Sequence, residues 1–177
     1  MYLKNISLLL QNLRMMLHQA YVDEIIPKNP TLGVKRLPQG MTDADPFTIE
    51  EYEEIIAGCR RYFPLYVNYV ICGFWTGWRP NEAGALKWNR VDFRQGKILI
   101  REGRVLRQVG TPKSSGSLRD IDILAPVQEA LMTQKPISYM AGNYVFLDAK
   151  QRPIDQELFH QKIWEPLLKR LTLLEYQ

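Results

Sequence analysis

Apolar residues near the start of the chain recur every three or four positions, which is the period of an amphipathic helix. The positions are Ile6, Leu9, Leu10, Leu13, Met16 and Leu17. We therefore predict a helix over residues 2–20, reaching about Val22. A lone helix cannot bury its own apolar stripe, so it must pack on the main domain, on a second copy or on another part of the protein. The next stretch, "IIPKNPTLGVKRLPQG", has three prolines and two glycines and is predicted to be an extended linker.

A compact domain is predicted to begin near Phe47. Thr48 is a suitable N-cap, and Glu51 follows three residues later, which is the capping-box pattern of a helix start. Residues 64–74 are apolar nearly all round, so they are predicted to form the central helix of the core. A further helix is predicted over residues 125–134.

The last predicted helix runs from Asp155 to about Leu171. Its apolar residues recur at steps of four, and Pro166 is expected to bend or break it. The four tryptophans of the chain are most simply explained as core aromatics: Trp75, Trp78, Trp88 and Trp164.

Short alternating segments between these helices predict strands. They are "KILI" (97–100), "RVLRQV" (104–109) and "SLRDIDI" (117–123), joined by the turn-like links "EGR" and "TPKSSGS". Three close strands with short links indicate a small antiparallel meander. The predicted fold is therefore α+β and mainly α, with a three-stranded antiparallel sheet.

Positive charge is concentrated in one part of the chain. The whole chain has a net charge of +4, whereas residues 87–119 alone carry nine basic and two acidic residues, which is +7. The basic residues are Lys87, Arg90, Arg94, Lys97, Arg101, Arg104, Arg107, Lys113 and Arg119. This distribution favours an anionic partner, although a solvated surface of a purely structural domain has the same composition.

Metal and membrane sites are not indicated. Two cysteines and two histidines in 177 residues, with no CxxC spacing, do not predict a zinc site or a disulfide framework. The apolar runs are too short for a membrane span, and the N-terminus has no signal-peptide pattern. We predict an intracellular, cytoplasmic protein without a zinc site.

The stretch "TGWRPNEAGALKWNRVDF" (76–93) contains the candidate chemistry. Gly77 permits a turn, Pro80 suits the first turn of a helix, and Arg79 then projects from a helix N-terminus. A guanidinium at a helix start is a favourable phosphate site. Glu82 is able to reach back to Arg79 or to backbone amides. From spacing alone, a local structural ion pair between these two side chains is the simpler explanation.

The longer pattern, Thr-Gly-x-Arg-x-x-Glu-Ala-x-x-Leu-x-Trp-x-x-Val-Asp-Phe, resembles the first-arginine box of the tyrosine recombinases, the phage-integrase family. Downstream, "TPKSSGSLRDIDI" is similar to the family's lysine-bearing β-hairpin. By this resemblance, residues 1–24 correspond to the last helix of a mostly missing core-binding domain, and 25–46 to a linker. Residues 47–177 correspond to the N-terminal part of the catalytic domain.

The resemblance implies that the parent protein cuts and rejoins DNA through a 3′-phosphotyrosine intermediate, without cofactor or metal. Arg79 matches the arginine that stabilises the transition state, Lys113 the lysine that protonates the leaving 5′-oxygen, and Glu82 the residue that orients the arginine. Double-stranded DNA is the implied partner, bound in the family by a homo-tetramer. Candidate contacts to the DNA backbone, chosen by charge, are Lys35, Arg36, Arg104, Arg107 and Arg119.

The chain also departs from the family pattern. The His-x-x-Arg box and the nucleophilic tyrosine of the family lie beyond the last predicted helix, and Tyr176 comes too early to be that nucleophile. We therefore expect a truncated recombinase from a phage or mobile element, inactive by itself. The alternative is a non-catalytic DNA-binding protein derived from the recombinase fold.

Overall fold

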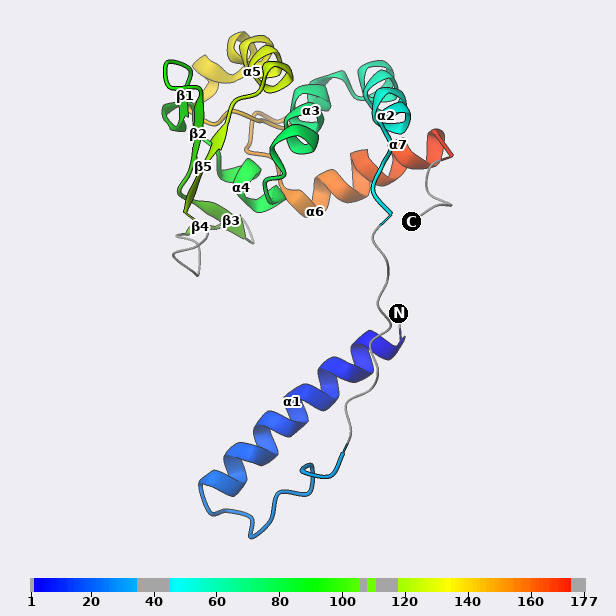
Figure 1. Ribbon diagram of the computed structural model, residues 1–177, viewed down its shortest axis with the longest axis vertical. Helices are drawn as coiled ribbons and strands as arrows, with labels where there is room; N and C mark the ends of the chain where they lie inside the picture. Colours follow the sequence, from blue (N-terminus) through cyan, green and yellow to red (C-terminus); the bar gives the residue numbers. More distant parts are fainter. Residues whose placement is uncertain (1, 35–44, 106–107, 111–117, 173–177) are drawn as a thin grey trace. The chain divides into compact units, whose positions relative to one another are not determined.

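The computed structural model describes residues 2–34, 45–105, 108–110 and 118–172 (Figure 1). The chain divides into two compact units, Met1–Ala44 and Asp45–Gln177. None of the helices in the described ranges is long and apolar enough to cross a lipid bilayer.

The first unit consists of α1 (Tyr2–Val22) and the segment that follows it, which confirms the helix predicted from the three–four period. The guanidinium of Arg14 donates to the carbonyl of Val34 at 2.7 Å, so the returning chain is fixed to the helix. The side-chain oxygen of buried Asn29 accepts hydrogen bonds from the backbone N–H and the hydroxyl of Thr31, an Asx-type turn. Residues 35–44 of the predicted linker lie outside the described ranges.

The second unit packs its helices around α3 (Val67–Thr76), the predicted central helix, which contacts α5 (Ala125–Ser138) and α2 (Ile49–Tyr62) (Figure 1). Thr48 caps α2, and the reciprocal bonds of a capping box with Glu51 are both present, as predicted. The shorter helices are α4 (Pro80–Ala85), α6 (Gln156–Phe159) and α7 (Glu165–Arg170), with 3-10 turns at Pro64–Tyr66, Trp88–Arg90 and Tyr139–Ala141.

Side chains from these helices and from the sheet meet in one core. Those with no exposed surface include Ile55, Cys59, Cys72, Ile98, Leu131 and Leu167. Burial raises the pKa of the Cys59 and Cys72 thiols to about 12, so both side chains act as small apolar groups.

The main sheet is antiparallel and has the strand order β1-β2-β5, from β1 (Val91–Asp92), β2 (Lys97–Ile100) and β5 (Arg119–Asp122). Ile98 of the central strand lies opposite both Val91 and Ile121. Ile98 and Ile100 are buried while the alternating residues Lys97 and Leu99 are only partly buried, so the sheet packs one face on the core.

The prediction that residues 104–109 form one strand of this sheet is wrong. Instead, β3 (Gly103–Val105) and β4 (Gln108–Gly110) pair with each other as a separate antiparallel ribbon, with Val105 opposite Gln108. The third strand of the main sheet is β1. A six-residue alternation fits one strand or two short ones equally well, and Leu-Arg at 106–107 contains no residue that signals a turn.

The tryptophan prediction holds for Trp78 and Trp88, which are buried, and Trp164 packs on the core while partly exposed. The prediction of a core position is wrong for Trp75, which lies near the end of α3 and is 43% exposed. The Trp75 indole N–H donates to the Tyr52 hydroxyl at 3.0 Å, and the two rings meet edge to face. This one aromatic neighbour and one hydrogen bond satisfy the side chain at the surface.

The predicted last helix is continuous but not regular. Between α6 and α7, residues His160–Trp164 form a π-helical turn, in which the Glu165 N–H donates to the His160 carbonyl. Pro166 follows at once. Its ring would clash with the carbonyl of Lys162 in a regular α-helix, and the wide turn relieves this clash. Pro166 therefore distorts the helix without ending it.

Gly84 in α4 gives a test of how closely α4 packs. A Cβ at Gly84 would lie 2.7 Å from the carbonyl oxygen of Ile154, whereas a Cβ at Gly73 in α3 would meet nothing nearer than 3.9 Å. We expect Gly84→Ala to lower the free energy of unfolding by about 1–3 kcal/mol through overpacking, measured by urea denaturation. The matched control, Gly73→Ala, is expected to raise it by about 0.5–1 kcal/mol. Equal effects of the two substitutions would contradict the close packing of α4.

Candidate functional site

Arg79 stands at the junction between α3 and α4. Gly77, with φ of 58°, ends α3 in the left-handed conformation, and its N–H donates to the carbonyl of Gly73 at 3.2 Å. Arg79 is then extended at the N-cap of α4, with Pro80 in the first helical position. This geometry directs the Arg79 side chain outward, and 66% of its surface is exposed.

The Glu82 carboxylate lies beneath Arg79 and is only 5% exposed. Its Oε2 accepts the backbone N–H of Arg79 at 2.8 Å, and its Oε1 accepts Nη1 of Arg79 at 3.0 Å. The ion pair that the spacing indicated is therefore present, and the same carboxylate satisfies the first N–H of the helix start.

Arg119 binds the same carboxylate. Its Nη1 donates to Oε1 of Glu82 at 2.9 Å and its Nη2 donates to Oε2 at 2.8 Å, a two-pronged charge-assisted contact. Arg119 belongs to β5, where it pairs with Ile100, and its carbonyl accepts Nη1 of Arg101 at 3.1 Å. The bond from Arg119 to Glu82 thus connects the main sheet to the start of α4.

These contacts determine the charge state of Glu82. Burial by itself would raise the pKa of the carboxyl group, but the hydrogen bonds from Arg119 and from Arg79 outweigh it. The pKa of Glu82 therefore lies below its ordinary value, and the group is a carboxylate at neutral pH. The same bond raises the pKa of Arg119.

Four of the nine basic residues in the segment 87–119 form ion pairs in the folded protein. Lys87 pairs with Glu102 at 2.8 Å, and Lys97 pairs with Asp122 at 2.8 Å. Arg101 and Arg119 also have carboxylate partners, Asp120 and Glu82. Three of these four carboxylates lie outside the segment, so its surplus of +7 overstates the charge available to a ligand.

Of the other residues predicted to contact DNA, the structure describes only Arg104. Arg104 is partly buried on β3, and its Nη1 donates to the carbonyl of Pro153 at 2.7 Å. This contact fixes the β3–β4 ribbon to the loop that precedes α6. Three of the predicted DNA contacts lie outside the described residues: Lys35, Arg36 and Arg107. The predicted catalytic residue Lys113 also lies outside them.

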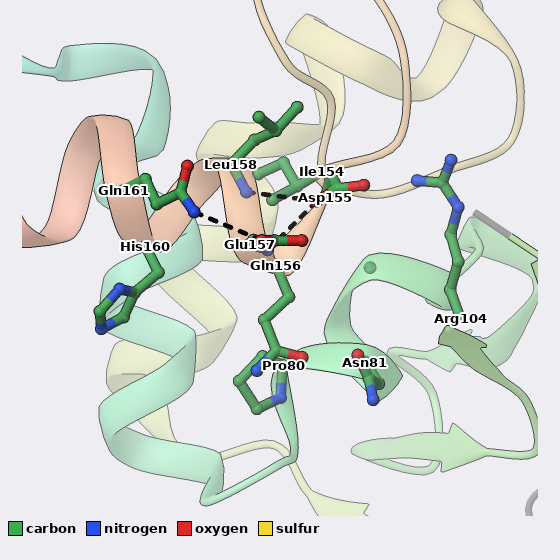
Figure 2. Close-up of a pocket in the computed structure, with 11 residues that line it drawn as sticks. Pro80, Asn81, Arg104, Ile154, Asp155, Gln156, Glu157, Leu158, His160 and Gln161 are labelled. Atoms are coloured by element: carbon green, nitrogen blue, oxygen red, sulfur yellow. Dashed lines mark hydrogen bonds between the residues drawn. The ribbon is translucent and has the colours of Figure 1, made fainter. Parts of the chain in front are cut away.

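A cavity of about 690 Å³ opens beside the start of α4, between α4, β3 and α6 (Figure 2). Pro80, Asn81 and Gly84 form its α4 side and Arg104 its β3 side. The α6 side is polar and includes Asp155, whose carboxylate accepts the N–H groups of Glu157 and Leu158 and so caps α6. No pattern in the sequence indicates this cavity, because it forms only where residues 80–84 lie next to residues 154–161.

No protein-family model matches the chain. The chain is 29% identical over 118 residues to IntQ of Escherichia coli (strain K12), whose name describes it as a defective protein. That match covers 66% of this chain and 29% of IntQ. The chain is also 26% identical to the ICEBs1 integrase of Bacillus subtilis (strain 168), covering 90% of this chain and 47% of that integrase. The chain thus spans less than half the length of these relatives.

Solved structures share the fold. The integrase of transposon Tn1549, in complex with a circular intermediate DNA, matches with a TM-score of 0.81 at 18% identity, covering 96% of this chain and 58% of that one. The lambda integrase tetramer bound to a Holliday junction matches with a TM-score of 0.71 at 15% identity, covering 91% of this chain and 46% of that one. The predicted fold class, mainly α with a small three-stranded antiparallel sheet, is confirmed.

The low pKa of Glu82 predicts a pH dependence of stability. Because the folded-state pKa lies below the ordinary value of 4.5, the stabilisation is complete above that value and is lost as the pH falls through the folded-state pKa. We expect Glu82→Gln to lower the free energy of unfolding by about 1–3 kcal/mol at pH 7. The difference from the wild type is expected to shrink as the pH falls below 4.5. Urea denaturation at each pH measures this.

Glu129→Gln, which changes an exposed carboxylate of α5, is the matched control and is expected to show neither effect. A difference between wild type and Glu82→Gln that stays constant from pH 7 to pH 3 would show that the Glu82 charge does not stabilise the fold.

Proposed function

Since the chain is related in sequence to integrases and has the fold of the tyrosine recombinases, we propose that it is part of a site-specific DNA recombinase. In this proposal, the full-length protein cuts and rejoins DNA at recombination or attachment sites. Residues 47–177 provide the N-terminal part of its catalytic domain, and residues 1–24 the last helix of its core-binding domain.

The exposed and oriented guanidinium of Arg79 is the observation that carries the proposal. One Nη of Arg79 binds a buried carboxylate, which holds the side chain at the start of a helix. Glu82 is the only ion-pair partner of Arg79 within the described ranges, so most of its N–H donors face solvent. Fixed, outward donors of this kind bind the non-bridging oxygens of a phosphodiester and stabilise the extra negative charge of a pentavalent transition state.

The proposed reaction proceeds in two steps that share one intermediate. A tyrosine hydroxyl attacks the phosphorus, the bond to the 5′-oxygen breaks, and a 3′-phosphotyrosine bond forms. The leaving 5′-oxygen takes a proton, and we assign this proton to Lys113 from the family resemblance. A 5′-hydroxyl of the partner strand then attacks the phosphotyrosine, the bond between phosphorus and the tyrosine oxygen breaks, and the DNA backbone is restored. The hydroxyl loses its proton and the released tyrosine oxygen gains one, so the step balances. The bond energy is retained throughout, so the reaction needs no nucleotide.

The proposed partners follow from this reaction. The substrate is double-stranded DNA, and strand exchange between two sites is consistent with a homo-tetramer, as in the lambda integrase tetramer bound to a Holliday junction. With bacterial relatives and a DNA substrate, we place the protein in the bacterial cytoplasm. Lys35, Arg36, Arg104 and Arg107 remain candidate contacts to the DNA backbone.

A non-catalytic DNA-binding protein is the second candidate. Among residues 1–177, His18 and His160 are the only histidines, and neither is followed by arginine three positions later. The two candidates differ in whether the coding sequence beyond Gln177 supplies a His-x-x-Arg box and a tyrosine.

The recombinase proposal requires Arg79 to contact a DNA phosphate, which a salt titration tests. We expect Arg79→Ala to weaken binding to a labelled duplex and to reduce the slope of log affinity against log salt by about one, the loss of one phosphate contact. Arg79→Lys keeps the charge and loses the planar fork, so the slope is retained while affinity falls. Fluorescence anisotropy measures both quantities.

Arg152→Ala is the matched control, because Arg152 is exposed and pairs with Asp148 in a different part of the second unit. If Arg79→Ala binds DNA no differently from Arg152→Ala, Arg79 does not contact phosphate and the recombinase proposal loses its main support.

We expect the 177-residue chain by itself to form no covalent bond with DNA, because it contains no His-x-x-Arg box. The test is incubation with a nicked suicide duplex carrying the attachment site, followed by denaturing electrophoresis. A protein–DNA adduct would contradict this expectation. Loss of that adduct in Tyr176→Phe would identify Tyr176 as the nucleophile after all.

A further inference from the structure

The Glu82 carboxylate is shared between two arginines that are 40 residues apart in the sequence. Arg79, on the exposed side, takes one hydrogen bond site on each carboxylate oxygen, through its backbone N–H and its Nη1. Arg119, from the sheet, takes one further site on each oxygen with its two Nη groups. A carboxylate has about four acceptor sites, so this one is fully used.

We propose that Arg119 is a positioning residue, which holds Glu82 and through it presents Arg79 to a phosphate. This inference rests on the function proposed for Arg79, and it assigns Arg119 a role different from the direct contact with the DNA backbone that its charge suggested. Two observations support it, the orientation of the carboxylate and the charge balance of the three groups.

The ion pair between Arg79 and Glu82 would not by itself fix the orientation of the Arg79 guanidinium. They are three residues apart at the start of α4, a helix of only six residues for which Arg79 is the N-cap, and Arg79 is largely exposed. Pairs of this kind hold long side chains loosely. The two-pronged bond from Arg119 fixes the plane of the carboxylate, because it engages both oxygens from a strand that is hydrogen-bonded into the sheet. A fixed plane gives the Arg79 guanidinium a fixed direction.

The charge balance leads to the same role. Glu82 carries one negative charge, and Arg79 and Arg119 carry one positive charge each, so the three groups together have a net charge of +1. Without Arg119 the remaining pair is neutral and attracts a phosphate less strongly. Arg119 itself is two-thirds buried, and both of its Nη groups bind Glu82. Arg119 therefore neutralises Glu82 and leaves the charge of Arg79 for the ligand.

A double-mutant cycle on DNA affinity tests the proposal. The variants are Arg79→Ala, Arg119→Ala and the two combined, each titrated with a labelled duplex at several salt concentrations. We expect Arg119→Ala to weaken binding at least about threefold when Arg79 is present and by less than about 1.5-fold when residue 79 is alanine, because coupled residues are non-additive. A direct phosphate contact would give the same loss in both backgrounds, which would overturn the proposal.

Two controls separate positioning from folding. Urea denaturation identifies any variant that is unfolded, and Arg152→Ala, which breaks an arginine–carboxylate pair elsewhere, is expected to be additive with Arg79→Ala. If Arg119→Ala does not fold, the cycle is run with Arg119→Lys, which keeps the charge and loses the two-pronged bond. Coupling to Arg79 is expected again, and additivity would overturn the proposal.

The cycle also distinguishes this inference from the function on which it rests. If Arg79→Ala alone leaves DNA affinity and salt slope unchanged, the recombinase proposal fails. If Arg79→Ala weakens binding but Arg119→Ala is additive with it or has no effect, only the role of Arg119 fails.

Discussion

The arrangement of the second unit around α4 depends on the hydrogen bonds that Arg79 and Arg119 donate to the buried carboxylate of Glu82. This carboxylate is one of the few charged groups removed from solvent in the described ranges, and it is stable there because four hydrogen bonds from two arginines surround it. The same contact does three things at once: it completes the start of α4, it attaches α4 to the sheet, and it orients an exposed guanidinium. The guanidinium that we propose to bind phosphate is therefore held by a contact within the fold itself.

Basic residues that cluster along the sequence lie beside acidic residues in the fold. Residues 87–119 contain the basic surplus of the chain, yet Lys97, Arg101 and Arg119 each meet a carboxylate from outside that segment. Antiparallel pairing places β2 beside β5 and so brings basic and acidic residues together as cross-strand neighbours. These pairs lower the positive charge that the segment presents to a ligand below the +7 of its sequence.

Local patterns predicted the local structure well, and non-local contacts explain what they missed. The cap at Thr48, the strand at residues 97–100 and the pair of Arg79 with Glu82 all follow from spacings of a few residues. The bond from Arg119 to Glu82 spans 37 residues, and no local pattern indicates it. The ribbon β3–β4 was missed because alternation does not show where a chain reverses. Trp75 was misplaced because residue type does not determine which end of a helix is covered.

The π-helical turn before Pro166 also affects how the last helix presents its apolar residues. In a regular α-helix, residues four apart are rotated by about 40° beyond a full turn, so a stripe at strict steps of four winds around the axis. Phe159, Ile163, Leu167 and Leu171 follow such steps, and all four are buried or partly buried. A wider turn rotates each residue by less and so counters the winding. The irregular turn thus straightens the stripe, and a helix interrupted by proline keeps one side against the core along its whole length.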